Sequence, residues 1–184
     1  MSSPKEIRTR MKSVEQTLKI TNAMYLIASS NLRKAKAQLE KAEPYFTRID
    51  ETIADILCRS PQLSHPFLDQ RKTITPAERE VGYVVVSGDK GLAGAYNHNV
   101  LKLAERRVRE TVHPKLFVVG LVGRAYFQQR GIPFEEDFSY VVQNPTMRRA
   151  RDISDELVQR FLDWDLDEVR ILYTEMVSAL RLEV

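Results

Sequence analysis

Residues 7–56 read IRTRMKSVEQTLKITNAMYLIASSNLRKAKAQLEKAEPYFTRIDETIADI, and the rest of the chain is expected to be organised around this stretch. Its apolar and small positions are separated by steps that alternate between four and three residues. The series is Ile7, Met11, Val14, Leu18, Thr21, Tyr25, Ala28, Leu32, Ala35, Leu39, Ala42, Phe46, Ile49, Ile53 and Ile56. A mean spacing of 3.5 residues is typical of a coiled-coil helix, because it keeps one seam facing a partner helix. A helix of about 50 residues is about 75 Å long, so we expect it to protrude from the rest of the molecule.

The predicted helix has recognisable signals along its length. Ser2 or Ser3 is a suitable N-cap, and Pro4 is favourable in the first turn. Pro44 removes one backbone hydrogen bond, but the seam stays in phase across it, which predicts a bend rather than an end. We therefore assign residues 1–59 to a coiled-coil helix. The only cysteine, Cys58, lies among apolar residues, which predicts a buried and unreactive side chain.

Positive charge is concentrated in the first 41 residues. They carry nine Lys and Arg against three acids, a balance of +6, whereas the remainder has a balance of −3. A second apolar stripe lies off the seam and consists of Ile20, Ala23, Met24 and Ile27. A basic helix that is apolar on more than one face indicates enclosure by other protein, with an acidic surface as the natural partner. The alternative is that the wider apolar band is only the inside of a helical bundle.

The sequence pattern changes after the helix. Residues 60–80 contain three prolines and no clear periodicity, which predicts a linker. Residues 81–184 alternate between short apolar runs and helical spacing: strands are predicted over 81–86, 115–120 and 168–174, and helices over 95–111, 124–130 and 146–164, with residues 176–184 as a candidate fourth strand. This alternation predicts a small, mostly parallel, three-layer α/β domain. The fold class is thus α/β, with a long N-terminal coiled-coil helix that protrudes.

Composition excludes several classes of protein and of site. The chain has no apolar run of about 18 residues and no apolar core of a signal peptide near its start, so we predict no transmembrane helix. The histidines His65, His98 and His113 are scattered, and none stands in a recognisable arrangement with Ser, Asp or Cys. The sequence therefore predicts no catalytic residue, no metal site and no bound cofactor.

One glycine-rich turn resembles a nucleotide-binding loop. Gly88, Gly91 and Gly94 follow the first strand in the stretch SGDKGLAG. A dinucleotide loop needs G-x-G-x-x-G and an acid at the end of the second strand, and a P-loop needs G-x-x-x-x-G-K-[ST]; neither pattern is met. We therefore interpret the three glycines as a structural turn that brings strand and helix close. A nucleotide-binding α/β enzyme that uses the Gly88–Gly94 turn is retained as an alternative.

A basic coiled-coil protein that binds nucleic acid is the second alternative. Arg33, Lys34 and Lys36 could neutralise phosphates. However, Met24 and Ile27 lie among the basic residues, and apolar side chains favour packing against protein.

The residues of the long helix resemble those of a known family. The stretch IRTRMKSVEQTLKITNAM (7–24), followed by ASSNLRKA (28–35), is similar to the N-terminal helix of ATP synthase gamma subunits, in which the pattern is roughly I-x-x-R-I-x-S-V-x-x-T-x-K-I-T-K-A-M-x-M-V-A-A-S-K-L-R-x-A. The turn SGDKGLAGAYN (87–97) resembles the family's S-D-[KR]-G-L-C-G-x-x-N. The stretches GRAYF (123–127) and DEV (167–169) also lie in the expected order. The resemblance covers essentially all 184 residues.

This resemblance implies a central rotor-stalk subunit of an F-type ATP synthase, without catalysis of its own, that couples proton or sodium flow to ATP synthesis or hydrolysis. The implied partners are the alpha and beta subunits that surround the shaft, the epsilon subunit and the membrane c-ring. The implied location is peripheral, at the cytoplasmic face of the bacterial inner membrane. The residues expected on or near the face turned to the alpha/beta ring are Arg8, Lys19, Ile20, Ala23, Met24, Ile27, Arg33, Lys34 and Lys36.

The sequence also departs from the family pattern. Asn22 and Asn31 replace lysines, Ala93 replaces the cysteine of the turn, and Gly88 resembles an insertion. The paired cysteines of the chloroplast regulatory insertion are missing, so thiol control is not expected. The family's C-terminal shaft helix, which pairs antiparallel with the N-terminal helix, has no counterpart before Val184. Residues 1–184 are therefore expected to be either a fragment of a gamma-type chain or a truncated variant without this second helix.

Overall fold

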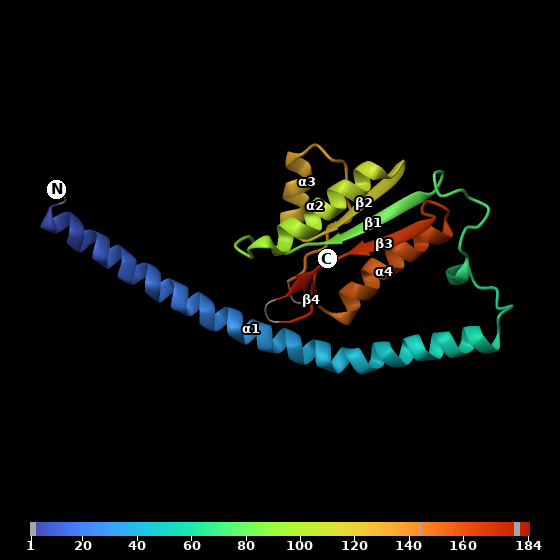
Figure 1. Ribbon diagram of the computed structural model, residues 1–184, viewed down its shortest axis with the longest axis horizontal. Helices are drawn as coiled ribbons and strands as arrows, with labels where there is room; N and C mark the ends of the chain where they lie inside the picture. Colours follow the sequence, from blue (N-terminus) through green and yellow to red (C-terminus); the bar gives the residue numbers. More distant parts are fainter. Residues whose placement is uncertain (1–2, 144, 179–180) are drawn as a thin grey trace. The chain divides into compact units, whose positions relative to one another are not determined.

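The computed structural model describes residues 3–143, 145–178 and 181–184, which belong to two compact units (Figure 1). The helical unit comprises residues 1–64, and the α/β unit comprises residues 65–184.

A single helix, α1, dominates the helical unit. It runs without interruption from Pro4 to Arg59, and its 56 residues are about 84 Å long at 1.5 Å per residue. Ser3 Oγ accepts the N–H of Lys5 at 3.3 Å and caps the first turn; the other candidate cap, Ser2, lies outside the described residues. Pro44 lies within the helix, and the ribbon curves along its length without breaking (Figure 1). The prediction of one continuous long helix is confirmed.

The polar residues of α1 are compatible with its apolar seam because they bond to the helix backbone. Five threonine hydroxyls each donate to the carbonyl four residues earlier, at 2.7–3.1 Å, including that of Thr21 in the seam. Such bonds satisfy the hydroxyl locally. The prediction that Cys58 is buried is wrong, since Cys58 is exposed and α1 has no buried residue among those described. None of the described helices is long and apolar enough to cross a bilayer.

Three parallel strands form the centre of the α/β unit, in the order β2-β1-β3. The elements follow one another as η1 (Pro66–Leu68), β1 (Glu80–Val86), α2 (Ala95–Glu110), β2 (His113–Val119), α3 (Leu121–Gln129), α4 (Met147–Leu162), β3 (Glu168–Leu172), β4 (Glu175–Met176) and β5 (Leu182–Glu183). In the central strand, Tyr83 lies opposite Leu116 of β2 and Arg170 of β3. The apolar run of β1 suits a strand that is paired on both edges and covered on both faces.

Two apolar cores lie on opposite faces of this sheet, which gives the unit three layers. On one face Tyr83 and Val85 pack with residues of α2 and α3, including Leu101 and Phe127. On the other face the core contains Val84, Phe117, Val119, Phe138, Leu157 and Leu166, of which Leu157 belongs to α4. Figure 1 shows the three strands side by side with α2 and α3 grouped together. The predicted α/β class and the mostly parallel sheet are confirmed.

Two elements differ most from the prediction, whereas the bounds of the other helices and strands of the α/β unit differ by one or two residues. Helix α3 begins at Leu121, three residues earlier than expected, so that Gly123 lies inside it. The candidate fourth strand over 176–184 is instead part of a separate antiparallel pair, in which β4 and β5 are two residues each. Residues 179–180 of that stretch lie outside the described part of the chain.

Candidate functional site

The seam of α1 forms an extended apolar surface that is open to solvent. Ile7, Leu18, Leu32 and Phe46 are each at least half exposed, and the same holds for most large side chains of the series. Exposed apolar surfaces of this extent mark sites of interaction with other proteins. The two next longest described helices, α2 and α4, have 16 residues each, or about 24 Å. Neither is long enough to cover the seam of α1.

The second apolar stripe lies on its own face of α1. Ile20, Ala23, Met24 and Ile27 are separated by three, one and three residues, and this spacing places them on one side of an α-helix. Ile20 and Ile27 are each 62% exposed, and Met24 is 55% exposed. The helix therefore presents two separate apolar faces between residues 18 and 28.

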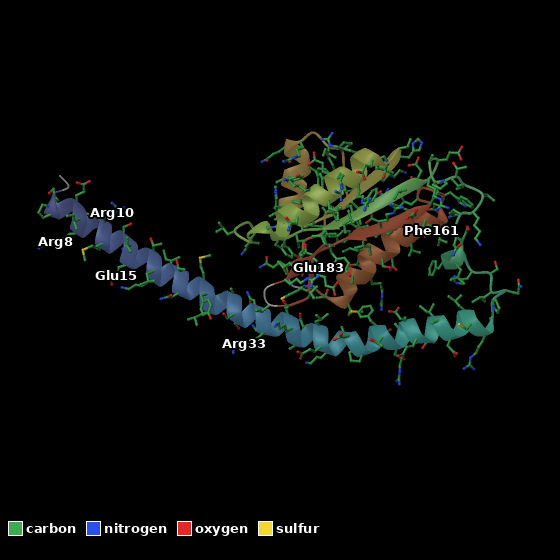
Figure 2. The ribbon with its side chains drawn as sticks, in the orientation of Figure 1. Arg8, Arg10, Glu15, Arg33, Phe161 and Glu183 are labelled. Atoms are coloured by element: carbon green, nitrogen blue, oxygen red, sulfur yellow. The ribbon has the colours of Figure 1, made fainter. Side chains whose placement is uncertain are left out.

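Basic side chains lie beside these faces, and Figure 2 shows Arg8, Arg10 and Arg33 along the ribbon of α1. Lys19 pairs with Glu15 at 3.0 Å, and both side chains are exposed. Such exposed pairs contribute at most about 1 kcal/mol, so Lys19 remains available to a stronger acidic partner. Arg33 Nε donates to the carbonyl of Ser29 at 3.4 Å.

Several basic side chains of α1 have no acidic partner in the part of the chain that the structure describes. Arg8, Lys34 and Lys36 form no ion pair with any residue that the structure describes. The surface of α1 can thus bind a protein that is acidic and partly apolar. The nine residues predicted from the sequence to contact a partner are all exposed on α1. They are Arg8, Lys19, Ile20, Ala23, Met24, Ile27, Arg33, Lys34 and Lys36. Their contact with a partner remains a prediction.

A regular basic stripe on α1 was missed in the sequence. Lys5, Lys12, Lys19 and Arg33 are separated by multiples of seven residues, so they follow the same line along a coiled-coil helix. Lys12, Lys19 and Arg33 each stand one position after a residue of the seam. The stripe can be found in the sequence by looking for basic residues, rather than apolar ones, at the seven-residue spacing of the seam.

The glycine-rich turn lies at the carboxyl end of β1, where ligands bind in many α/β folds. Here its polar groups bond to residues of α2 and α3. Gly88 N–H donates to Asn97 Oδ1 at 2.7 Å. Asp89 Oδ1 accepts the N–H of Leu121 at 3.2 Å, and the carbonyl of Gly88 accepts the N–H of Val122 at 3.0 Å. The first donors of α3, which could bind a phosphate, already have partners within the protein.

The three glycines of the turn differ in their surroundings. A Cβ at Gly88 would lie 3.1 Å from Asn97 Oδ1, and Gly94 has a positive φ of 56° just before α2. A Cβ at Gly91 would meet nothing within 4 Å. Our interpretation of the turn as structural rests on Gly88 and Gly94. Among the described residues no group of three His, Cys, Asp or Glu side chains is placed to hold a metal ion.

Comparison with known proteins places the whole chain in one family. A family model described as ATP synthase matches residues 3–184. The gamma chain of the ATP synthase of Ruminiclostridium cellulolyticum is 43% identical over 97% of this chain, and that of Acetivibrio thermocellus is 42% identical over all of it. A gamma chain of Acetobacterium woodii named as sodium ion specific is 35% identical over 95% of the chain.

A solved structure is similar in fold. The central stalk and c-ring structure of the mitochondrial ATP synthase of Tetrahymena thermophila contains a chain that aligns with a TM-score of 0.65 and 21% identity. The alignment covers 89% of this chain and 69% of that one. The chain spans 60% of the length of the Ruminiclostridium cellulolyticum gamma chain and 61% of that of Acetivibrio thermocellus. Because the family model covers residues 3–184 and these curated relatives are gamma chains, the protein belongs to the ATP synthase gamma-chain family.

Proposed function

We propose that this chain is the central rotor-stalk subunit of an F-type ATP synthase and has no catalysis of its own. The observation that carries the proposal is α1, a 56-residue helix with no buried residue among those described. A helix with an open apolar seam and unpaired basic side chains is suited to enclosure by a partner with an acidic surface. Membership of the gamma-chain family supports this assignment.

The proposed mechanism uses the shape and the charge of α1. The helix is curved (Figure 1), and its basic stripe, its seam and its second apolar stripe occupy different sides. A rotating shaft of this kind presents a different face to each of three surrounding catalytic sites in turn. Each site then receives a different interaction free energy from the same shaft, which shifts its equilibrium between binding states. Ion flow would thus be coupled to ATP synthesis or hydrolysis in the alpha/beta ring.

The proposed partners are the alpha and beta subunits around α1, with the epsilon subunit and the membrane c-ring in contact with the α/β unit. The proposed location is peripheral, at the cytoplasmic face of a bacterial inner membrane. The residues proposed to contact the alpha/beta ring are the nine predicted from the sequence, of which Arg8 is the first and Lys36 the last.

Neither alternative function has a supporting observation. Nucleotide binding at the Gly88–Gly94 turn would compete with the internal hydrogen bonds of Asp89 and Asn97. Nucleic-acid binding by α1 would leave the second apolar stripe, with Ile20 and Ile27 exposed, without a partner.

Co-purification with alpha and beta subunits tests the proposal. The tagged chain should recover both subunits and be present as one copy per complex. Reversing charge in Lys34→Glu plus Lys36→Glu should weaken recovery, and the loss should be greatest at low salt because screening already weakens the contact at high salt. The matched control is Arg106→Glu plus Arg107→Glu, which changes charge equally on exposed positions of α2. A chain that recovers neither subunit contradicts the proposal.

A further inference from the structure

The segment between α1 and β1 holds an arginine that is buried although the segment around it is mostly exposed. Arg71 is 4% exposed, and its backbone has a positive φ of 48°, a conformation that non-glycine residues seldom adopt. Such a conformation persists where the surroundings determine it. The contacts of Arg71 must therefore account for both its burial and its backbone conformation.

The guanidinium of Arg71 lies between two aromatic rings at the end of α4. Its central carbon is 3.5 Å from the ring centre of Trp164 and 4.4 Å from that of Phe161. Its Nη2 also donates to the carbonyl of Phe161 at 2.7 Å. Figure 2 labels Phe161 near the end of α4. Stacking and a hydrogen bond from the same planar group fix both its position and its orientation.

Acidic side chains surround the same guanidinium. Asp69 lies 3.1 Å from Nη1, and Asp167, at the start of β3, lies 3.9 Å from Nε. The other oxygen of Asp167 accepts the N–H of Glu80 at 3.0 Å, at the start of β1. One carboxylate thus links Arg71 to the first residue of the central strand.

A second arginine, Arg79, contacts the backbone at Arg71. Nη2 of Arg79 lies 3.2 Å from the carbonyl of Gln70 and 3.4 Å from that of Arg71, while its Nη1 lies 3.5 Å from Glu168. The N–H of Ile74 donates to the carbonyl of Arg71 at 3.0 Å. Residues 69–79 are therefore held at the amino-terminal edge of the sheet by one buried side chain and its neighbours.

We propose that Arg71 is a positioning residue that fastens the segment following α1 to the sheet. Only residues 60–70 separate it from the last residue of α1, and the single element among them is the three-residue η1. A load on α1 that travels along the chain is passed at Arg71 to α4, β3 and β1. The load path rests on the proposed rotor function, whereas the fastening of the segment by Arg71 does not.

Amide hydrogen exchange on the 184-residue chain tests the fastening. Arg71→Asn removes the guanidinium but tolerates the left-handed backbone. We expect exchange at Arg71, Ile74 and Glu78 to be faster by about tenfold or more, with exchange in β1 and β2 unchanged, because the segment opens locally. Arg71→Lys keeps the charge without the planar group and should give an intermediate increase.

Arg130→Asn is the matched control, because Arg130 also stacks on an aromatic ring, Tyr126, at 3.8 Å and pairs with Glu105 at 3.2 Å. It should leave exchange in residues 69–79 unchanged. Equal increases in the segment and in β1 would overturn the proposal, since Arg71 would then only stabilise the whole unit. No change in the segment would also overturn it.

The load path through Arg71 is tested in the assembled complex by the thermal angular fluctuations of a probe fixed to the α/β unit. Arg71→Asn should widen these fluctuations, which is a loss of torsional stiffness, while the rate of ATP hydrolysis without load stays the same. Unchanged fluctuations overturn the load path. Failure of the wild-type chain to assemble contradicts the rotor function instead, and the exchange result still decides the fastening.

Discussion

Asp165 joins the end of α4 to β2 through two basic side chains. Lys115 Nζ donates to its carboxylate, and Arg160 Nη1 donates to its other oxygen at 3.1 Å. The hydrogen bond from Lys115, followed by that from Arg160, lowers the pKa of Asp165 below its ordinary value, against the opposing effect of burial. Arg160 also contacts Glu135 and Glu156, so this cluster ties three segments of the unit together.

The lowered pKa of Asp165 predicts a pH dependence of stability. The carboxylate stabilises the fold above its unfolded pKa of about 3.9, and this contribution is lost as the pH falls through the lower folded pKa. Because the side chain is 39% exposed, solvent screening limits its contribution at pH 7 to about 1 kcal/mol. Asp165→Asn should lower the free energy of unfolding by about that amount at pH 7 and flatten its decline below about pH 4.

Urea unfolding of the chain between pH 2 and 7 measures this effect. Asp163→Asn is the control, since among the hydrogen bonds of the described residues the Asp163 side chain accepts only one, from Gln159 Nε2 at 2.9 Å. An acid slope that Asp165→Asn leaves as steep as in the unaltered chain would show that the cluster does not act through this carboxylate.

At the scale of elements, the connection from β2 to α3 depends on a close backbone approach. Gly120 has a positive φ of 99°, and a Cβ there would lie 2.2 Å from the carbonyl oxygen of Ser87. Ser87 is fully buried, and its Oγ accepts the N–H of Gly123 at 2.9 Å. The first turn of α3 is thus built on the end of β1.

Alanine substitution should separate the glycines that this connection needs from one that it does not need. Gly120→Ala should lower the free energy of unfolding by about 3–5 kcal/mol, because the Cβ meets backbone that cannot move away. Gly91→Ala should change it by no more than about 0.5 kcal/mol, since the space around Gly91 is open. Thermal denaturation of the two variants compares them directly. Similar losses in both would contradict the close approach of Gly120 to Ser87.

The local sequence pattern was sufficient to predict the elements in which apolar residues recur regularly or form one continuous run. The heptad spacing from Ile7 to Ile56 predicted α1, and the apolar run ending at Val86 predicted β1. The start of α3 was missed because Gly123 suggests a break, whereas its missing Cβ makes room for Ser87, which lies 36 residues earlier. No local signal shows that Arg71 is buried, because its partners Phe161 and Asp167 are about 90 residues away. The predicted contact face of α1 depends on a partner, so neither pattern nor fold decides it.

At the scale of the whole molecule, the chain combines two units with different requirements. The α/β unit has two apolar cores of its own, whereas the helical unit has no buried residue among those described. An isolated helix gains little stability without packing, so α1 depends on contacts with other helices or subunits. We therefore propose that α1 carries the contacts with the surrounding subunits, while the α/β unit folds around its own two cores.

ATP-driven rotation of the chain within an assembled complex tests this account most directly. Cys58 is the only cysteine of the sequence and is exposed near the end of α1, so a probe can be attached there while the alpha and beta subunits are fixed to a surface. If α1 is the rotor shaft, the probe should turn in one direction in three equal steps per revolution when ATP is added. A probe that remains bound to the complex during ATP hydrolysis without turning would contradict it.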